Sequence, residues 1–286
     1  MELMPRRSRP IVCVDFLLDQ LRVIEVLDGQ ITAYFVRPLP PGSFRSGDPV
    51  EPTLIGMELQ QSMRAVGMQA TEARLAMSDE AAVAKVVELP AMPNRHLRKA
   101  VAYLAERELP FPPERTAWSW EVLSRNATTI QVYLVGAWRD VVERVSEVAT
   151  SAGLVPTIVE PRGLAVARGL GLPRVTVLEA HRNQLHLTQV LPLQAPYVDI
   201  AICPSDPTEA ESAIERLLQR SSRHQLGLND PGSSPVVLAG DLESAGLTLK
   251  VAAAPVSDVL NGNPPHRPPA MDAAHYVASI GLAMRN

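Results

Sequence analysis

The sequence predicts an α/β protein with two lobes. Short strands alternate with amphipathic helices along its 286 residues, and a chain of this length usually forms about two domains. A three-strand meander followed by helices also occurs twice, first from Ile11 and again from Val175. We therefore expect two lobes that each begin with an antiparallel meander.

In the first half, apolar runs predict strands, and apolar residues at helical spacing predict helices. Asp28-Gly29 is a hairpin signal, and residues 15–20 are expected to form a tight joint between the first two strands. The strands are expected at 11–14, 21–26, 31–36, 74–77, 83–89, 117–123, 130–136 and 157–159. The helices are expected at 55–66, 97–105, 141–149 and 163–168.

The second half repeats the meander and then adds a long helix. That helix has a clear start, because Asp206 can cap it, Pro207 suits its first turn and Glu209 can complete a capping box. The strands of this half are expected at 175–178, 185–191, 197–202 and 236–238. A closing helix is expected at 271–284.

Composition argues against several classes of protein. Hydrophobic residues make up 46% of the chain, enough for a sizeable core and too many for a disordered protein. A net charge of −4 and only 4% aromatic residues do not favour nucleic-acid binding. Cys13 and Cys203 are too few for a disulfide scaffold. The longest apolar stretch without charges, 184–198, is too short to span a membrane, so we expect a cytoplasmic protein with reduced thiols.

The sequence lacks the common motifs of enzymatic chemistry. No glycine-rich loop precedes Lys-Ser/Thr, and Gly169-Leu170-Gly171 lacks the third glycine of a dinucleotide fingerprint. There is no C-x-x-C and no G-x-S-x-G. His181 and His186 could share a metal ion, but a solvated pair is the usual case. Asp15 and Asp19 are more typical of a turn than of a cation site, so we expect no metal site.

Short motifs that extend over nearly the whole chain carry a family resemblance. They are V-E-L-P-A-M-P at 87–93, L-P-F-P at 109–112, A-G-L-V-P at 152–156, V-L-A-G-D at 237–241 and Y-V-A-S-I-G-L-A-M-R at 276–285. In this order they resemble the actin-like proteins, and most closely the PilM-type proteins of type IV pilus assembly. The resemblance implies an actin-like (ribonuclease H-like) two-lobed fold with an inserted α+β subdomain in the first lobe.

The same resemblance gives the expected domain boundaries. Residues 1–70, together with 155–174, should form the sheet subdomain of the first lobe, and 71–154 should form the inserted small subdomain. Residues 175–286 should form a truncated second lobe, because the chain is too short to give that lobe a small subdomain of its own.

The resemblance also assigns vestigial positions of a nucleotide site. Leucines stand where the first phosphate loop of the family has Gly-Ser, and a histidine and an aspartate replace glycines in the other two loops. Backbone amides need the room that glycine leaves in order to approach a phosphate, so the loops indicate a pseudo-enzyme without a cofactor. The positions are Asp15, Leu17, Leu18, Arg22, Glu179, His181, Gly240 and Asp241.

For function, the resemblance implies a non-catalytic cytoplasmic scaffold of a type IV pilus-like or type II secretion-like assembly. A PilN-like bitopic protein would hold it at the inner membrane, with the partner's tail in a groove between the first lobe and the insert. Self-association is compatible with this role, whereas nucleic-acid binding and membrane insertion are not expected. The groove candidates are Leu89, Met92, Leu97, Val101, Leu104, Leu109 and Phe111.

Three alternatives stay open on the sequence alone. The retained Asp15 and Gly240 are compatible with an actin-like ATP-binding switch or ATPase that uses ATP and Mg²⁺. A module like the cytoplasmic part of the type II secretion L proteins would share the fold, although no transmembrane helix is predicted. The groove candidates, finally, are also what the core of the insert would need.

Overall fold

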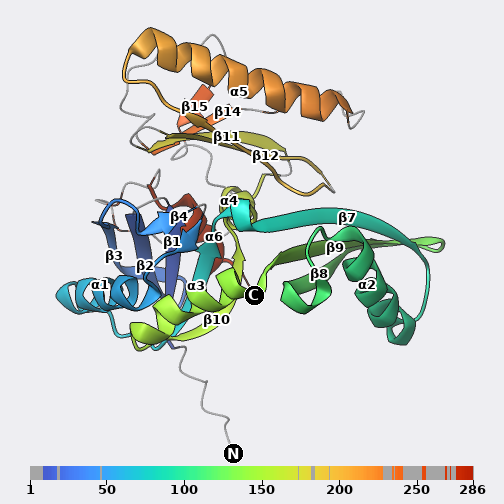
Figure 1. The fold of residues 1–286 in the computed structure, drawn as a ribbon, viewed down its shortest axis with the longest axis horizontal. Coiled ribbons are helices and arrows are strands. Elements are labelled where there is room, and N and C mark those ends of the chain that lie inside the picture. Colours follow the sequence, from blue (N-terminus) through green and yellow to red (C-terminus); the bar gives the residue numbers. More distant parts are fainter. Residues whose placement is uncertain are drawn as a thin grey trace, which may run out of the picture.

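The computed structural model consists of two lobes and a subdomain that projects from the first lobe (Figure 1). Each lobe is built on a five-stranded mixed sheet, and a separate three-stranded sheet forms the projecting subdomain. The structure describes residues 9–285 except 18–19, 46, 173, 182–183, 193, 228–233, 235, 241–252, 256–267, 269–270 and 272–274.

The first sheet has the strand order β10-β6-β1-β2-β3. β1 pairs antiparallel with β2 and parallel with β6, so a meander is extended by parallel strands. A short hairpin of β4 (Phe44–Arg45) and β5 (Asp48–Pro49) precedes the first helix. The sheet and its helices comprise β1 (Ile11–Leu17), β2 (Gln20–Leu27), β3 (Gln30–Pro38), α1 (Pro52–Ala65), β6 (Glu72–Met77), α3 (Arg139–Ser151), β10 (Val155–Pro161) and α4 (Arg162–Leu170).

The second sheet repeats this topology in the order β13-β12-β11-β14-β15. β11 again pairs antiparallel with the next strand and parallel with β14, so the predicted repeat of the meander is confirmed. The elements are β11 (Val175–His181), β12 (Gln184–Val190), β13 (Tyr197–Ile202), α5 (Pro207–Gly227), β14 (Val236–Gly240), β15 (Ala253–Pro255) and α6 (Val277–Ala283). Only 241–252 separate β14 from β15, an interval too short for a counterpart of the subdomain in the first lobe.

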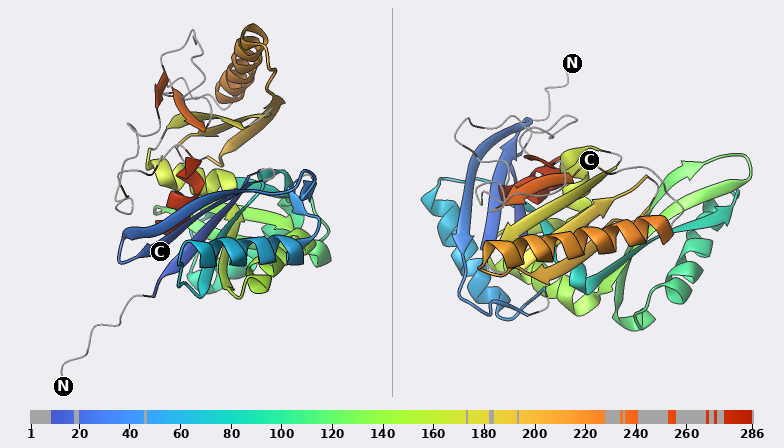
Figure 2. Two further views of the ribbon diagram at one scale, coloured as in Figure 1. Left: turned by 90° about the vertical axis from the view of Figure 1, so that its left-hand side faces the viewer. Right: turned by 90° about the horizontal axis from the view of Figure 1, so that it is seen from above.

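The two sheets and their helices form five layers (Figures 1 and 2). Helices α1 and α3 cover the outer face of the first sheet, and α5 covers the outer face of the second. Helices α4 and α6 lie between the sheets and share one hydrophobic core with both. The lobes are therefore joined by a common apolar layer rather than by a linker.

The insert is an independent α+β unit. Strands β7 (Ala82–Pro90), β9 (Thr129–Trp138) and β8 (Thr116–Arg125) form an antiparallel sheet in the order β7-β9-β8, and α2 (Asn94–Glu108) packs on one face of it. Two single 3₁₀ turns, at Asp79–Ala81 and Pro113–Arg115, flank β7 and β8. The expected bounds of 71 and 154 were too wide, because β6 pairs within the first sheet and α3 packs with α1.

The strands of the first hairpin and the last helix also differ from expectation. The joint predicted at 15–20 is shorter, since Asp15 and Leu17 are strand residues paired with Arg22 and Gln20. The closing helix was expected from 271 but begins only at Val277. Strand pairing continues past the apolar residues, because it satisfies the backbone N–H and C=O groups of the hairpin. The apolar run alone therefore does not indicate where the strands of this hairpin end.

Helices α4 and α6 cross at one glycine of each helix, Gly169 of α4 and Gly281 of α6. A Cβ added to Gly281 would lie 1.7 Å from the carbonyl oxygen of Ala165, and one added to Gly169 would lie 2.4 Å from that of Val277. Each glycine thus faces backbone of the other helix, and no side chain fits between them. This reciprocal contact allows two helices to fill the narrow layer between the sheets.

We expect Gly281→Ala to destabilise the protein by about 3 kcal/mol or more, because the methyl group must push the α4 backbone away from α6. Urea unfolding monitored by circular dichroism measures this. Gly67→Ala is the control: its Cβ meets nothing within 4 Å, and its φ of +76° costs only about 1 kcal/mol. Equal losses in the two variants would contradict the close crossing.

Candidate functional site

Two carboxylates face each other across the middle layer, one from each lobe. Asp15 is the fifth residue of β1 and Glu179 the fifth residue of β11, so the repeat places them at equivalent positions. Side chains alternate along a strand, so Asp15 shares the face of Cys13 and Glu179 that of Val177, and both faces border the shared core. Asp15 and Glu179 are 0% and 1% exposed.

Arg162, the first residue of α4, bridges these two carboxylates. Its Nε donates to Asp15 Oδ1 at 2.9 Å and to Oδ2 at 3.2 Å. Its Nη1 and Nη2 donate to Glu179 Oε2 at 2.6 Å and to Oε1 at 2.8 Å. The guanidinium itself is buried, so one cation joins the two lobes in the interior of the molecule.

Electrostatics hold this arginine in its charged form. Burial alone lowers the pKa of Arg162, but the charges of Asp15 and Glu179 outweigh burial and raise that pKa above its usual range. A planar guanidinium with a fixed fork of donors fits two carboxylates better than an ammonium group would. The three side chains form an ionic cluster that we call the inter-lobe triad.

The other predicted nucleotide positions surround this triad only in part. Leu17 is buried at the end of β1, and Arg22 is buried opposite Asp15 with its Nη1 donating to the carbonyl of His275 at 3.1 Å. His181 and Gly240 end the neighbouring strands β11 and β14. Leu18 and Asp241 lie outside the described residues.

Sequence reasoning missed Arg162. It predicted a short helix at this place but assigned no role to its first residue. A cation directly after a proline at a helix start is not a signal of any site. It gains meaning only when two strands more than a hundred residues apart place carboxylates beside it.

The groove candidates do not form an open surface. Leu97, Val101 and Leu109 are buried in the core of the insert with α2 packed on the sheet, and Leu104 is buried as well. Leu89, Met92 and Phe111 are partly buried against the same core. These candidates therefore contribute to the core of the insert, as the alternative interpretation of their apolar pattern held. The expected place of the groove, between the first lobe and the insert, stays a prediction.

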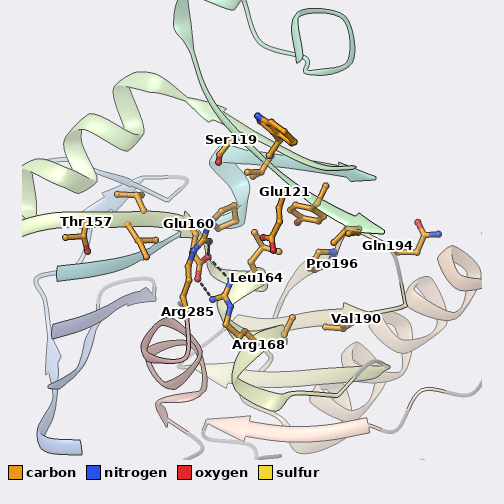
Figure 3. Close-up of a pocket in the computed structure, with 18 residues that line it drawn as sticks. Ser119, Glu121, Thr157, Glu160, Leu164, Arg168, Val190, Gln194, Pro196 and Arg285 are labelled. Carbon is orange, nitrogen blue, oxygen red and sulfur yellow. Dashed lines mark hydrogen bonds and ion pairs between the residues drawn. The ribbon is translucent and has the colours of Figure 1, made fainter. Parts of the chain in front are cut away.

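A cavity of about 460 Å³ lies where the insert meets the lobes (Figure 3). Figure 3 shows Ser119 and Glu121 of β8 on one side and Arg168 of α4 and Val190 of β12 on the other. Consecutive residues 157–161 of β10 line it. Side chains of a strand alternate between two faces, so a run of consecutive residues means that β10 presents its open edge to the cavity.

Two arginines of the cavity lining bind one buried carboxylate. Glu160 is 3% exposed and accepts from Arg168 Nη1 at 2.5 Å and from Arg168 Nη2 at 3.0 Å. Arg285 also pairs with Glu160, which ties the end of the last helix to the cavity wall. The rest of the lining is largely apolar, with Leu123, Val135, Ile158, Leu164 and Pro196 among its members.

A second cavity of about 450 Å³ adjoins the first and shares Tyr133, Pro161, Leu164 and Pro196 with it. Asp79 lines this second cavity and caps the start of α4, since both its carboxylate oxygens lie 3.0 Å from the Gly163 N–H. Burial raises the pKa of Asp79 to about 6, although the Gly163 N–H and the Arg162 charge oppose the rise. We call the surface that lines these two adjoining cavities, between the insert and the lobes, the trough.

Comparison with known proteins identifies the family. Residues 20–185 match the family model described as type IV pilus assembly protein PilM. The chain belongs to the PilM family. This confirms the resemblance noted in the motifs of the sequence. No curated protein sequence gives a significant match.

Solved structures agree with this assignment. A PilM–PilN type IV pilus biogenesis complex matches with a TM-score of 0.74 at 20% identity, covering 98% of this chain and 99% of that one. The cytoplasmic domain of EpsL, an inner-membrane component of the type II secretion system of Vibrio cholerae, matches with a TM-score of 0.56 at 14% identity, covering 97% and 96%. The ethanolamine utilization protein EutJ from Carboxydothermus hydrogenoformans matches with a TM-score of 0.50 at 12% identity, covering 99% and 91%.

These matches establish the actin-like, two-lobed α/β fold of this PilM-family chain. Among the described residues, no helix combines the length and apolar character needed to cross a membrane. The same part of the chain contains no cluster of three or more His, Cys, Asp or Glu suited to a metal ion.

We expect Asp79→Asn to raise the thermal midpoint by about 5 °C near pH 7.5. The folded protein holds a proton on Asp79 up to about pH 6, whereas the usual value of this group is 3.8. The free energy of unfolding therefore falls as pH rises through this window, and asparagine avoids the loss while its side-chain oxygen still caps Gly163.

The gain from Asp79→Asn should shrink steadily as the pH is lowered toward about 3, where the carboxyl group is largely neutral in both states. Differential scanning calorimetry across this pH range measures it. Glu80→Gln, at an exposed neighbouring residue, is the matched control and should change little at any pH. A lower midpoint for Asp79→Asn near pH 7.5 would mean that α4 needs the charge.

Proposed function

We propose that this PilM-family protein is a non-catalytic assembly factor that binds an extended segment of a PilN-like membrane protein in the trough beside the insert. The observation that carries the proposal is the open edge of β10, which faces the first cavity along residues 157–161. The PilM–PilN complex among the structural matches supports a partner of this kind.

The backbone of the trough suits an extended chain. β10 is the outer strand of the first sheet, and β8 is an outer strand of the insert sheet; both line the cavity. Unpaired N–H and C=O groups on such edges can hydrogen-bond to an added strand, which gives affinity without a defined side-chain sequence. A partner segment that enters here would lie between two strand edges.

The side chains of the trough supply anchors and polarity. Leu123 and Leu164 offer apolar contacts, and Glu121 is a charged group on the same side as Leu123. The hydroxyl of Tyr133 is buried without a hydrogen-bond partner and borders both cavities. An incoming peptide group could satisfy this hydroxyl, which removes a cost that the unliganded protein bears.

The non-catalytic part of the proposal rests on the inter-lobe triad. Nucleotide phosphates and Mg²⁺ need converging donors or free carboxylates, respectively. Here the carboxylates of Asp15 and Glu179 are already occupied by Arg162. A protein of this design would act by binding, and a partner anchored in the inner membrane would hold it at that membrane.

We expect Leu164→Ala and Leu123→Ala to weaken binding of a peptide that carries the cytoplasmic segment of the PilN-like partner. One lost anchor costs about 2 kcal/mol, roughly thirtyfold in affinity. Fluorescence anisotropy with a labelled peptide measures this, and thermal midpoints show whether each variant is folded.

Trp118→Ala is the matched control for this experiment. Trp118 and Leu123 are 40% and 38% exposed and lie on the same strand, but only Leu123 lines the cavity. The control should therefore keep wild-type affinity. Unchanged binding in both leucine variants, with folded proteins, would place the partner site elsewhere.

We also expect no tight ATP binding and no ATPase activity. Isothermal titration calorimetry with ATP, with and without Mg²⁺, should detect no binding with a micromolar or lower Kd. Micromolar affinity for Mg-ATP would contradict this part of the proposal. Reverting Leu17→Gly, Leu18→Ser and His181→Gly together should not restore binding while Arg162 is present, because the guanidinium still occupies Asp15 and Glu179.

A further inference from the structure

The walls of the trough come from both lobes as well as from the insert. Val190, Gln194 and Pro196 belong to the second lobe, whereas residues 157–161 and Leu164 belong to the first. The width of the trough therefore depends on how the lobes are placed relative to each other. Any interaction that sets this placement also sets the shape of the binding site.

Arg162 lies where such an interaction would act. It is the first residue of α4 and directly follows β10, and its neighbours Pro161 and Leu164 line both cavities. Its guanidinium contacts Asp15 of the first lobe and Glu179 of the second. The triad is thus connected directly to the wall of the trough through the backbone of 161–164.

We propose that Arg162 is an internal cation that holds the two lobes closed in place of a bound ligand, and that it thereby sets the width of the partner trough. Arg162 is in this sense a positioning residue. The second half of the proposal rests on the proposed function, whereas the first half stands on the triad alone.

The shared apolar core supplies a less directional restraint. Hydrophobic contact holds the lobes together, but its strength follows the apolar area buried and not the direction of a bond. The guanidinium fork has fixed directions, and it meets Glu179 with two hydrogen bonds of 2.6 and 2.8 Å while its Nε meets Asp15. A change in the angle between the lobes breaks at least one arm of this fork.

Electrostatics make the restraint strong. Asp15 and Glu179 are almost fully buried, so separating either from Arg162 leaves an unpaired charge away from water. Opening of the lobes must therefore admit water to the triad. Ligand-free closure follows, because the cation is part of the chain and is present at all times.

The test measures the distance between the lobes with spin labels. Met57 on α1 and Ser222 on α5 are both exposed, and they lie on the outer layers of the first and second lobe. Met57→Cys and Ser222→Cys are combined with Cys203→Ser. Cys13 can stay, because it is buried and its pKa is raised to about 12, which keeps the thiol unreactive toward the label.

With Arg162 present, double electron–electron resonance should give one narrow distance distribution, and Mg-ATP should leave it unchanged. Arg162→Ala should broaden the distribution and add longer distances, and it should lower the thermal midpoint by about 10 °C. Binding of the PilN-like peptide should weaken at least fivefold. The proposal would be overturned if the distance distribution of Arg162→Ala were unchanged. It would also be overturned if Mg-ATP shifted the distance distribution of the protein that retains Arg162.

Arg144→Ala is the matched control, since Arg144 also forms a fork on a carboxylate, Asp48, but within the first lobe. It should lower the midpoint without broadening the distribution. If Arg162→Ala does not fold, Arg162→Lys serves instead: the ammonium keeps the charge but cannot reproduce the fork, so the distribution should still broaden.

The outcomes separate the two proposals. Broadening without any peptide binding, even by the unmodified protein, would refute the partner site and leave Arg162 as the restraint on the lobes. Peptide binding that is equal in the unmodified and Arg162→Ala proteins, despite broadening, would refute the link between the triad and the trough.

Discussion

The structure depends on one close contact, the crossing of α4 and α6 between the two sheets. Gly169 and Gly281 face backbone of the opposite helix, so the helices approach without intervening side chains. The crossing lets a single layer of two helices share its core with both sheets. The layered fold, the orientation of α4 and the position of its first residue all follow from this constraint.

The inter-lobe triad lies at one end of the layer that α4 and α6 form between the two sheets. The apolar part of α4 packs between the sheets, and Arg162 at its start reaches the two carboxylates that continue the inward-facing rows of β1 and β11. A buried ion cluster adds little net stability relative to apolar packing, but removal of one partner leaves an uncompensated buried charge and is strongly destabilising. Here one buried cation joins a carboxylate of each lobe beside the shared apolar core.

The proposed partner site in the trough is made of segments of which none carries a motif. Its lining comes from all three strands of the insert, from β10 and α4 of the first lobe, from β12, β13 and α5 of the second lobe, and from Arg285. None of these segments is unusual by itself. Sheet edges that would be a liability when exposed become useful when an insert and a second lobe enclose them.

The sequence by itself determined the order and type of most elements, the repeated meander and the family. Periodicity sufficed for these features because burial of one face of an element dictates the local spacing of its apolar residues. It did not extend the first strand to Asp15, which was expected in the joint at 15–20 and which the structure places on β1. It could not separate a groove from a core at Leu97 and Val101, since both need the same apolar stripe. Only the tertiary structure decided that Arg162 meets Asp15 and Glu179 and that β10 keeps an open edge, because these contacts join residues that are remote in the chain and leave no local pattern.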